Sequence, residues 1–117
     1  MVVKRKNAKA NAAVLGEAQL QAVADLFATL SEPSRLRILQ VLEAGPASVA
    51  EIMQATGMKQ ANASKQLGIL HQAGVLARAK DGNLVRYSIR LPLVFDLCAL
   101  VCGSLRDEAL AKAKALI

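Results

Sequence analysis

The sequence predicts a mostly α-helical fold with one small β-hairpin, and two observations support this fold class. A helix start signal at Ser48 is followed by Gly57, then by a second amphipathic segment, and then by two strand-like runs around Asp81-Gly82-Asn83. The apolar share of the chain is 54% but its aromatic share is only 3%, so the core must consist of aliphatic side chains, which suits packed helices. With two helices expected before this region and one after it, the predicted order is α-α-α-α-β-β-α, that of a winged helix-turn-helix.

Short-range signals place the helix-turn-helix itself. Ser48 stands before an apolar periodic run, and Glu51 three residues later completes a capping box that opens a short helix. Gly57 supplies the positive φ that the C-terminal cap of that helix needs. A second helix is expected from about 59 to 73, where Gly74 stops it.

The second helix has one face expected to be buried and one expected to be exposed. Ala63, Leu67 and Leu70 have the spacing of a buried stripe. The opposite face is short, polar and basic, and bases in the major groove are contacted by short hydrogen-bonding side chains near a helix N-terminus. The alternative is that this polar face is only exposed to solvent and does not contact DNA. The DNA-contacting residues expected on this helix are Lys59, Gln60, Asn62, Ser64 and Lys65.

A basic β-hairpin is expected directly after this helix. The runs 75–80 and 84–89 flank Asp81-Gly82-Asn83, and Asp-Gly between two such runs is a strong hairpin signal. Strand alternation places Arg78 and Lys80 on one face, and Arg86 lies in the returning strand. We expect these three cations to contact phosphates. The hairpin therefore favours DNA binding over the solvated-face alternative.

The distribution of charge also favours nucleic acid as the partner. The net charge of +6 divides into +4 in residues 1–16, −3 in residues 17–58 and +5 in residues 59–90, while the remainder is balanced. Positive charge is thus concentrated in the expected DNA-binding region and at the start of the chain. We expect residues 1–16 to be a flexible basic tail and residues 17–117 to form one winged helix-turn-helix domain that ends in a dimerisation helix.

Membrane and enzymatic functions are not indicated by the sequence. The longest apolar run, 93–102, is interrupted by Asp96 and is too short to span a bilayer, so we expect a cytoplasmic protein with no membrane partner. No nucleophile has a plausible base beside it, and neither a phosphate-binding glycine loop nor a pair of carboxylates in a cleft is evident. We expect no enzymatic activity and no required cofactor.

Three further helices flank the helix-turn-helix and the hairpin. The first, about 17–30, carries Leu20, Val23, Ala24 and Phe27 on one face. The next is expected to be capped by Ser31, with Pro33 in its first turn, and to end at Gly45-Pro46. Its buried residues are expected to be Leu36, Ile38, Leu39 and Leu42. The last helix, about 93–115, follows Pro92.

The last helix indicates a homodimer. Its first half is apolar nearly all round, and a domain of this size has too little protein to cover it on every side. We therefore expect the first and last helices to form a two-fold interface, which would carry two DNA-contacting helices to half-sites about 34–36 Å apart. Burial of the last helix within its own monomer is the alternative.

With these elements in place, the chain resembles the ArsR/SmtB-type family of small bacterial repressors over roughly residues 17–105. The resemblance is carried by residues 30–39, which are similar to a Leu-x-x-Pro-x-Arg-Leu-x-Ile-Leu run, and by residues 60–67 with Leu70 and 73–76. It implies a homodimeric repressor that leaves its operator on double-stranded DNA when an inducer binds elsewhere. Such inducers are often a soft metal or metalloid ion or a reactive sulfur species.

The usual sensing sites of that family are not present in this chain. Residues 48–56 lack a Cys-x-Cys motif, and Asp96 has no histidines in the last helix to complete a zinc-type site. His71 is alone of its type, so we expect it to be a partly buried polar contact rather than a ligand.

The remaining candidates for a sensing site are Cys98 and Cys102, the only thiols. Their i, i+4 spacing separates the Cβ atoms by about 5–6 Å, whereas a disulfide needs about 3.5–4.5 Å. A thiophilic ion such as trivalent arsenic or antimony could bridge them, with a third ligand from the partner subunit, solvent or a small thiol. The alternatives are persulfide or redox chemistry between subunits, and a winged-helix regulator or interaction module in which the two cysteines only pack.

Overall fold

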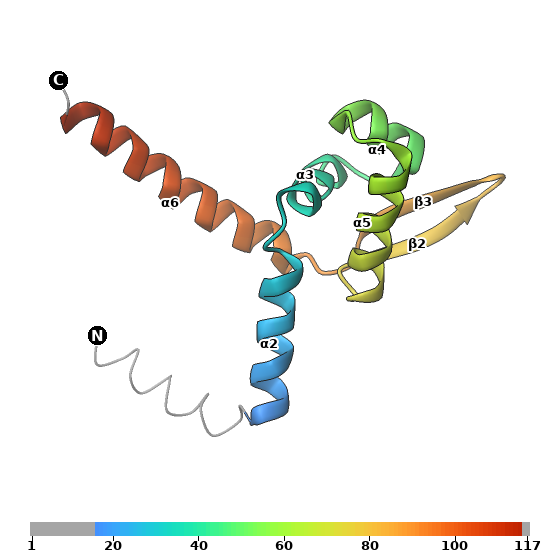
Figure 1. Cartoon of the computed structure of the whole chain (residues 1–117), viewed down its shortest axis with the longest axis horizontal. Coiled ribbons are helices and arrows are strands. Elements are labelled where there is room, and N and C mark those ends of the chain that lie inside the picture. The colour runs from blue at the N-terminus through green and yellow to red at the C-terminus, as the bar shows by residue number, and fades with distance from the viewer. Residues whose placement is uncertain (1–15, 116–117) are drawn as a thin grey trace.

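The structure, a computed structural model, describes residues 16–115 and confirms a mostly helical winged helix-turn-helix with a small β-hairpin (Figure 1). The tail predicted over residues 1–16 lies outside the described residues, apart from Gly16. The elements are α2 (Glu17–Thr29), α3 (Pro33–Leu42), β1 (Ala47–Ser48), α4 (Val49–Thr56), α5 (Gln60–Gln72), β2 (Leu76–Asp81), β3 (Leu84–Ile89) and α6 (Leu93–Ala115).

The core lies between α3, α4, α5 and the base of the hairpin. The predicted stripe of α5 is confirmed, because Ala63, Leu67 and Leu70 are completely buried. Aliphatic side chains from the neighbouring elements pack against it, and Tyr87 is the aromatic residue among the buried ones. Leu30 and Val94 belong to the same cluster, so the end of α2 and the start of α6 are anchored to this core.

The predicted turn between the two central helices is also confirmed. The Ser48 side chain accepts from the Glu51 N–H at 3.2 Å, and the Glu51 carboxylate accepts from the Ser48 N–H at 2.9 Å, which completes the capping box. Gly57 ends α4 in the left-handed region, with φ of 75°. Thr56 tightens the turn, because its hydroxyl donates to the Ile52 carbonyl at 2.7 Å and accepts from the Met58 N–H at 3.2 Å.

The prediction that Ser31 caps α3 was wrong. Glu32 is the N-cap, and its carboxylate accepts from the Ser34 N–H at 3.0 Å. A residue that precedes proline is disfavoured in the helical region, so Pro33 makes Glu32 the last extended residue before the helix. The Ser31 hydroxyl instead donates back to the Ala28 carbonyl at 2.6 Å.

The sheet differs from the prediction in two details. The two-residue strand β1 pairs with β3, so the order is β1-β3-β2 and the hairpin is joined to the start of α4. Asp81 ends β2 opposite Leu84 instead of lying in the turn, which leaves Gly82 and Asn83 as a two-residue loop. Gly82 has φ of 65°, a conformation that glycine adopts without strain.

Both α2 and α6 extend away from the core (Figure 1). No residue of α2 is buried, and Val94 is the buried residue of α6. Leu36 of α3, which we expected to be buried, is 40% exposed beside them. The radius of gyration is 17.8 Å, against about 13 Å for a compact domain of about 100 residues. A single copy of the chain therefore leaves these apolar helix faces uncovered.

Candidate nucleic-acid interface

The first turns of α5 present polar side chains to solvent. Lys59, the N-cap residue, makes no capping hydrogen bond with its side chain. The first N–H groups of the helix are therefore not satisfied by that side chain, and such groups suit a phosphate oxygen. The predicted contact residues of this helix are all exposed: Lys59, Gln60, Asn62, Ser64 and Lys65.

One α5 residue that sequence patterns did not single out organises this surface. Gln66 is 6% exposed, although it is polar and faces the core. Its side-chain oxygen accepts from Arg35 Nε at 2.9 Å, and its nitrogen donates to Asn62 Oδ1 at 3.1 Å. Arg35 also donates to the Thr29 carbonyl at 3.1 Å. Helical periodicity could have shown only that Gln66 flanks the buried stripe, because its partner Arg35 is 31 residues away.

The hairpin carries its cations on two faces. Directly opposed residues of a sheet share a face, and Arg78 lies opposite Tyr87 while Lys80 lies opposite Val85. Arg86 lies opposite Ala79 and therefore on the other face. Arg78 and Lys80 are exposed, and neither takes part in an ion pair within residues 16–115.

Arg86 is already engaged by two carboxylates. Its guanidinium lies 2.8 Å from Glu51 Oε1 and 3.0 Å from Asp81 Oδ2. The hydrogen bond to Asp81, followed by the charge of Glu51, raises the pKa of Arg86 above its ordinary value. The hydrogen bond from the Ser48 backbone is the largest cause that lowers the pKa of Glu51. A phosphate contact by Arg86, as predicted from sequence, would have to compete with both carboxylates.

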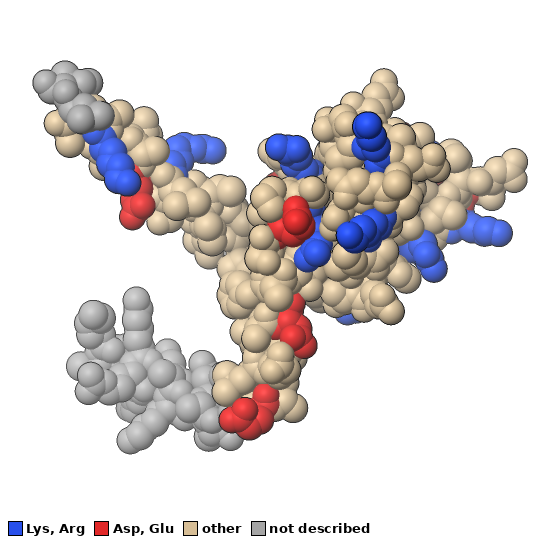
Figure 2. Space-filling view, viewed as in Figure 1, with Lys and Arg blue, Asp and Glu red and all other residues tan. Residues whose placement is uncertain are grey.

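Basic side chains gather over one part of the molecule. Figure 2 shows that Lys and Arg predominate over the part that contains α5 and the hairpin, that α2 carries Asp and Glu, and that α6 carries both kinds. The exposed basic residues of the first part are Lys59, Lys65, Arg78, Lys80 and Arg90. This arrangement suits the approach of a polyanion to α5 and the hairpin rather than to α2.

The two thiols lie in a second region, away from the basic surface. Cys98 is partly buried and Cys102 is exposed, and both line an apolar groove of about 720 Å³ between the end of α2, α3 and α6. Burial raises the pKa of the Cys98 thiol, and the neighbouring Cys102 and Glu43 raise it further. Within residues 16–115, no three His, Cys, Asp or Glu side chains converge as a metal site. His71, which we expected to be a partly buried polar contact, is half-buried on α5.

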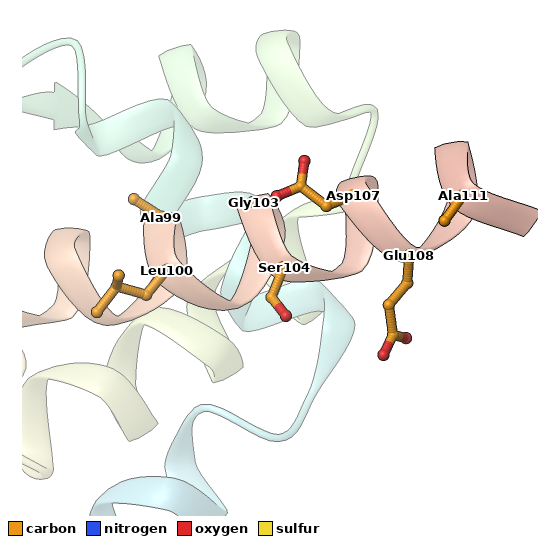
Figure 3. A pocket seen from close by; sticks show the side chains of 7 residues that line it. All are labelled: Ala99, Leu100, Gly103, Ser104, Asp107, Glu108 and Ala111. Carbon is orange, nitrogen blue, oxygen red and sulfur yellow. The ribbon is translucent and has the colours of Figure 1, made fainter.

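Another side of α6 forms a shallow strip (Figure 3). All the residues that line it belong to this one helix, so it is a surface strip and not an enclosed site. It combines small side chains with one exposed leucine and two acids: Ala99, Leu100, Gly103, Ser104, Asp107, Glu108 and Ala111. Among the described helices, none has the length and apolarity required to cross a bilayer.

Comparisons with known proteins agree with this geometry. A family model described as a helix-turn-helix domain matches residues 30–79. The uncharacterized HTH-type transcriptional regulator Rv0081 of Mycobacterium tuberculosis strain H37Rv is 42% identical over 78 residues, which are 66% of this chain and 68% of that protein.

Two solved structures are informative. The AntR antimony-specific transcriptional repressor has a TM-score of 0.73 and 30% identity, over 81% of this chain and 86% of that one. The homodimeric winged helix-turn-helix DNA-binding domain Mb0332 of Mycobacterium bovis, described as a possible ArsR-family regulator, has a TM-score of 0.68 and 35% identity, over 78% and 83% of the two chains. These proteins are transcriptional regulators rather than enzymes, as we expected for this chain. The chain belongs to the ArsR/SmtB-type family of winged helix-turn-helix transcriptional repressors.

Proposed function

We propose that the protein is a cytoplasmic, homodimeric repressor that binds a pseudo-palindromic operator on double-stranded DNA. Helix α5 enters the major groove with its N-terminal turns, and the hairpin lies along the adjacent phosphates. The observation that carries the proposal is that Gln60, Asn62, Ser64 and Lys65 on α5, and Arg78 and Lys80 on the hairpin that follows it, are all exposed. The first group supplies hydrogen bonds to bases and the second supplies charge for phosphates.

The dimer part of the proposal is supported by the uncovered apolar faces of α2 and α6. Phe27 is 54% exposed on α2, and Leu100 and Leu105 are 73% and 60% exposed on α6. Large exposed apolar side chains that follow one another along a helix mark an interaction surface. A homodimer is also the described state of the related domain Mb0332. We propose that the two copies pair α2 and α6 around a two-fold axis.

The operator proposal is tested by selecting duplexes from a random library and measuring competition titrations at fixed salt. Replacement of Ser64 or Lys65 by Ala should weaken binding to the selected duplex roughly tenfold for each lost base contact. Gln72→Ala, at the exposed C-terminal end of the same helix, is the matched control and should bind like the wild type. Binding that shows no preference among sequences would contradict the proposal.

We further propose that a thiophilic ion acts as inducer at Cys98 and Cys102. Both thiols line the apolar groove beside α2, α3 and α6, which is next to the proposed dimer interface. Support comes from thiolate chemistry, which selects soft centres, and from the relative that is described as an antimony-specific repressor. An ion bound there would favour one arrangement of the two subunits and so change the distance between the two α5 helices.

The inducer proposal is tested with the double substitution of Cys98 and Cys102 by Ser. The variant should bind the selected duplex like the wild type but should no longer be released by arsenite or antimonite. If the wild-type protein is released from the duplex by a persulfide donor or an oxidant, and not by arsenite or antimonite, the sulfur or redox alternative is favoured. If the double variant is still released by the ions, the two cysteines only pack in the interface.

A further inference from the structure

A directional chain of hydrogen bonds runs from the end of α2 to the exposed side of α5. Arg35 donates to the Thr29 carbonyl at 3.1 Å and to the Ala28 carbonyl at 3.5 Å. The Nε of Arg35 donates to Gln66 Oε1 at 2.9 Å, and Gln66 Nε2 donates to Asn62 Oδ1 at 3.1 Å. Asn62, the third residue of α5, is exposed, whereas Gln66 is 6% exposed.

The chemistry of Arg35 sets the direction of every bond in this chain. A guanidinium has only donors, so the atom of Gln66 that faces Arg35 must be the amide oxygen. The other atom of the Gln66 amide is then the NH2 group, which can only donate toward Asn62. The atom of Asn62 that faces Gln66 must in turn be its oxygen. The Asn62 NH2 group is thereby left at the outer end of the chain.

Burial makes this direction costly to reverse. If the Gln66 amide turned over, its NH2 group would face the donors of Arg35 and its oxygen would face away from them. The partly buried guanidinium would then lose its acceptor on Gln66, whose side chain is only 6% exposed, so water has limited access to replace the lost bond. The direction therefore persists when the outer face of α5 is covered by a ligand.

We propose that Arg35 and Gln66 are positioning residues that make Asn62 a hydrogen-bond donor toward DNA, an inference that rests on the proposed operator binding. Asparagine that contacts adenine in a bidentate manner uses its oxygen and its nitrogen together. In this protein the Asn62 oxygen is held by Gln66, so Asn62 contacts a hydrogen-bond acceptor through its NH2 group. That acceptor is either a base atom, such as O6 or N7 of guanine or O4 of thymine, or a phosphate oxygen.

The test is Gln66→Glu, which has nearly the same shape but only acceptors. The glutamate accepts from Arg35 on one side and from Asn62 on the other, so the Asn62 amide must turn over and direct its oxygen outward. Gln72→Glu adds the same charge to the exposed end of the same helix and is the matched control. Duplexes are selected from a random library with the wild type, Gln66→Glu and Gln72→Glu, and affinities are measured by titration.

The two sources of the acceptor give different results. If Asn62 contacts a base, Gln66→Glu should bind the wild-type operator about tenfold more weakly per half-site than Gln72→Glu does. The duplexes selected with Gln66→Glu should then prefer, at one position, a base that presents a hydrogen-bond donor in the major groove. If Asn62 contacts a phosphate, the loss should be similar for all sequences, with an unchanged base preference. An affinity and a preference equal to those of Gln72→Glu would overturn the inference.

A second variant keeps the proposal testable if Gln66→Glu does not fold. Asn62→Asp changes an exposed side chain and replaces its outward donor by an acceptor. Asn62→Asp should bind the operator more weakly than Asn62→Ala. The ratio of these two affinities should be larger than the ratio between Gln72→Ala and Gln72→Glu, which measures the effect of the added charge alone. If the affinity ratio of the Asn62 pair is equal to or smaller than that of the Gln72 pair, Asn62 does not act as a hydrogen-bond donor toward DNA. Loss of sequence preference by the wild type itself would instead refute the proposed function.

Discussion

One carboxylate oxygen of Glu51 accepts both the Ser48 N–H at 2.9 Å and the Arg86 guanidinium at 2.8 Å. The same atom therefore completes the capping box of α4 and holds β3 of the hairpin. Arg86 also lies opposite Ser48 in the pairing of β1 with β3, so the two bonds reinforce one strand register. The orientation of the hairpin relative to the helix-turn-helix is set by residues that are 35 positions apart.

Removal of Arg86 should affect DNA binding differently from removal of Lys80. Lys80→Ala should flatten the dependence of the binding constant on salt concentration by about one unit per lost phosphate contact in each subunit. Arg86→Ala should weaken binding through a displaced hairpin and leave that slope nearly unchanged, because its charge is already paired with Glu51 and Asp81. The measurement is a series of titrations across salt concentrations. A flattened slope for Arg86→Ala would restore the phosphate contact predicted from sequence.

Ser48→Ala should lower the free energy of unfolding by about 1 kcal/mol, because it removes the acceptor for the Glu51 N–H at the start of α4. Ser48 is buried, so water cannot easily replace the lost bond. Urea denaturation followed by circular dichroism measures the change. Ser64→Ala, on the exposed surface of α5, is the control and should change stability by much less. Equal effects of the two substitutions would show that the cap contributes little.

Stability should fall in acid because folding lowers the pKa of Glu51 and of Glu32 below their ordinary value of 4.5. A carboxylate with a depressed folded-state pKa contributes stability above its unfolded pKa and loses that contribution as the pH falls through the folded value. The loss should therefore begin near pH 4.5 and continue below it. Glu51→Gln should show a shallower loss than the wild type in denaturation series between pH 6 and pH 2.5. Identical curves would exclude Glu51 as a contributor.

Leu105→Glu should convert the dimer to a monomer without unfolding it. Leu105 is 60% exposed in one copy, so a charge there costs the monomer little but is buried without a partner in the proposed interface. Sedimentation velocity measures the oligomeric state. The control is Leu84→Glu, because Leu84 is 49% exposed on the hairpin and away from α6. A Leu105→Glu protein that remains dimeric would place the interface elsewhere.

The sequence by itself determined the five described helices, the hairpin and the exposed character of α5. The Ser48 capping box, the Gly57 turn and the Ala63 stripe act over a few neighbouring residues, so periodicity and cap signals were sufficient. The last helix was predicted with its observed bounds, 93–115, for the same reason.

Tertiary structure decided which polar groups are paired. The engagement of Arg86 by Glu51 and of Gln66 by Arg35 depends on contacts between residues 35 and 31 positions apart, which no local pattern encodes. The two-residue strand β1 was missed for a similar reason, since only its pairing with β3 makes it a strand. A side chain that seems free in the sequence is available for DNA only if no other part of the chain reaches it first, and packing alone determines that.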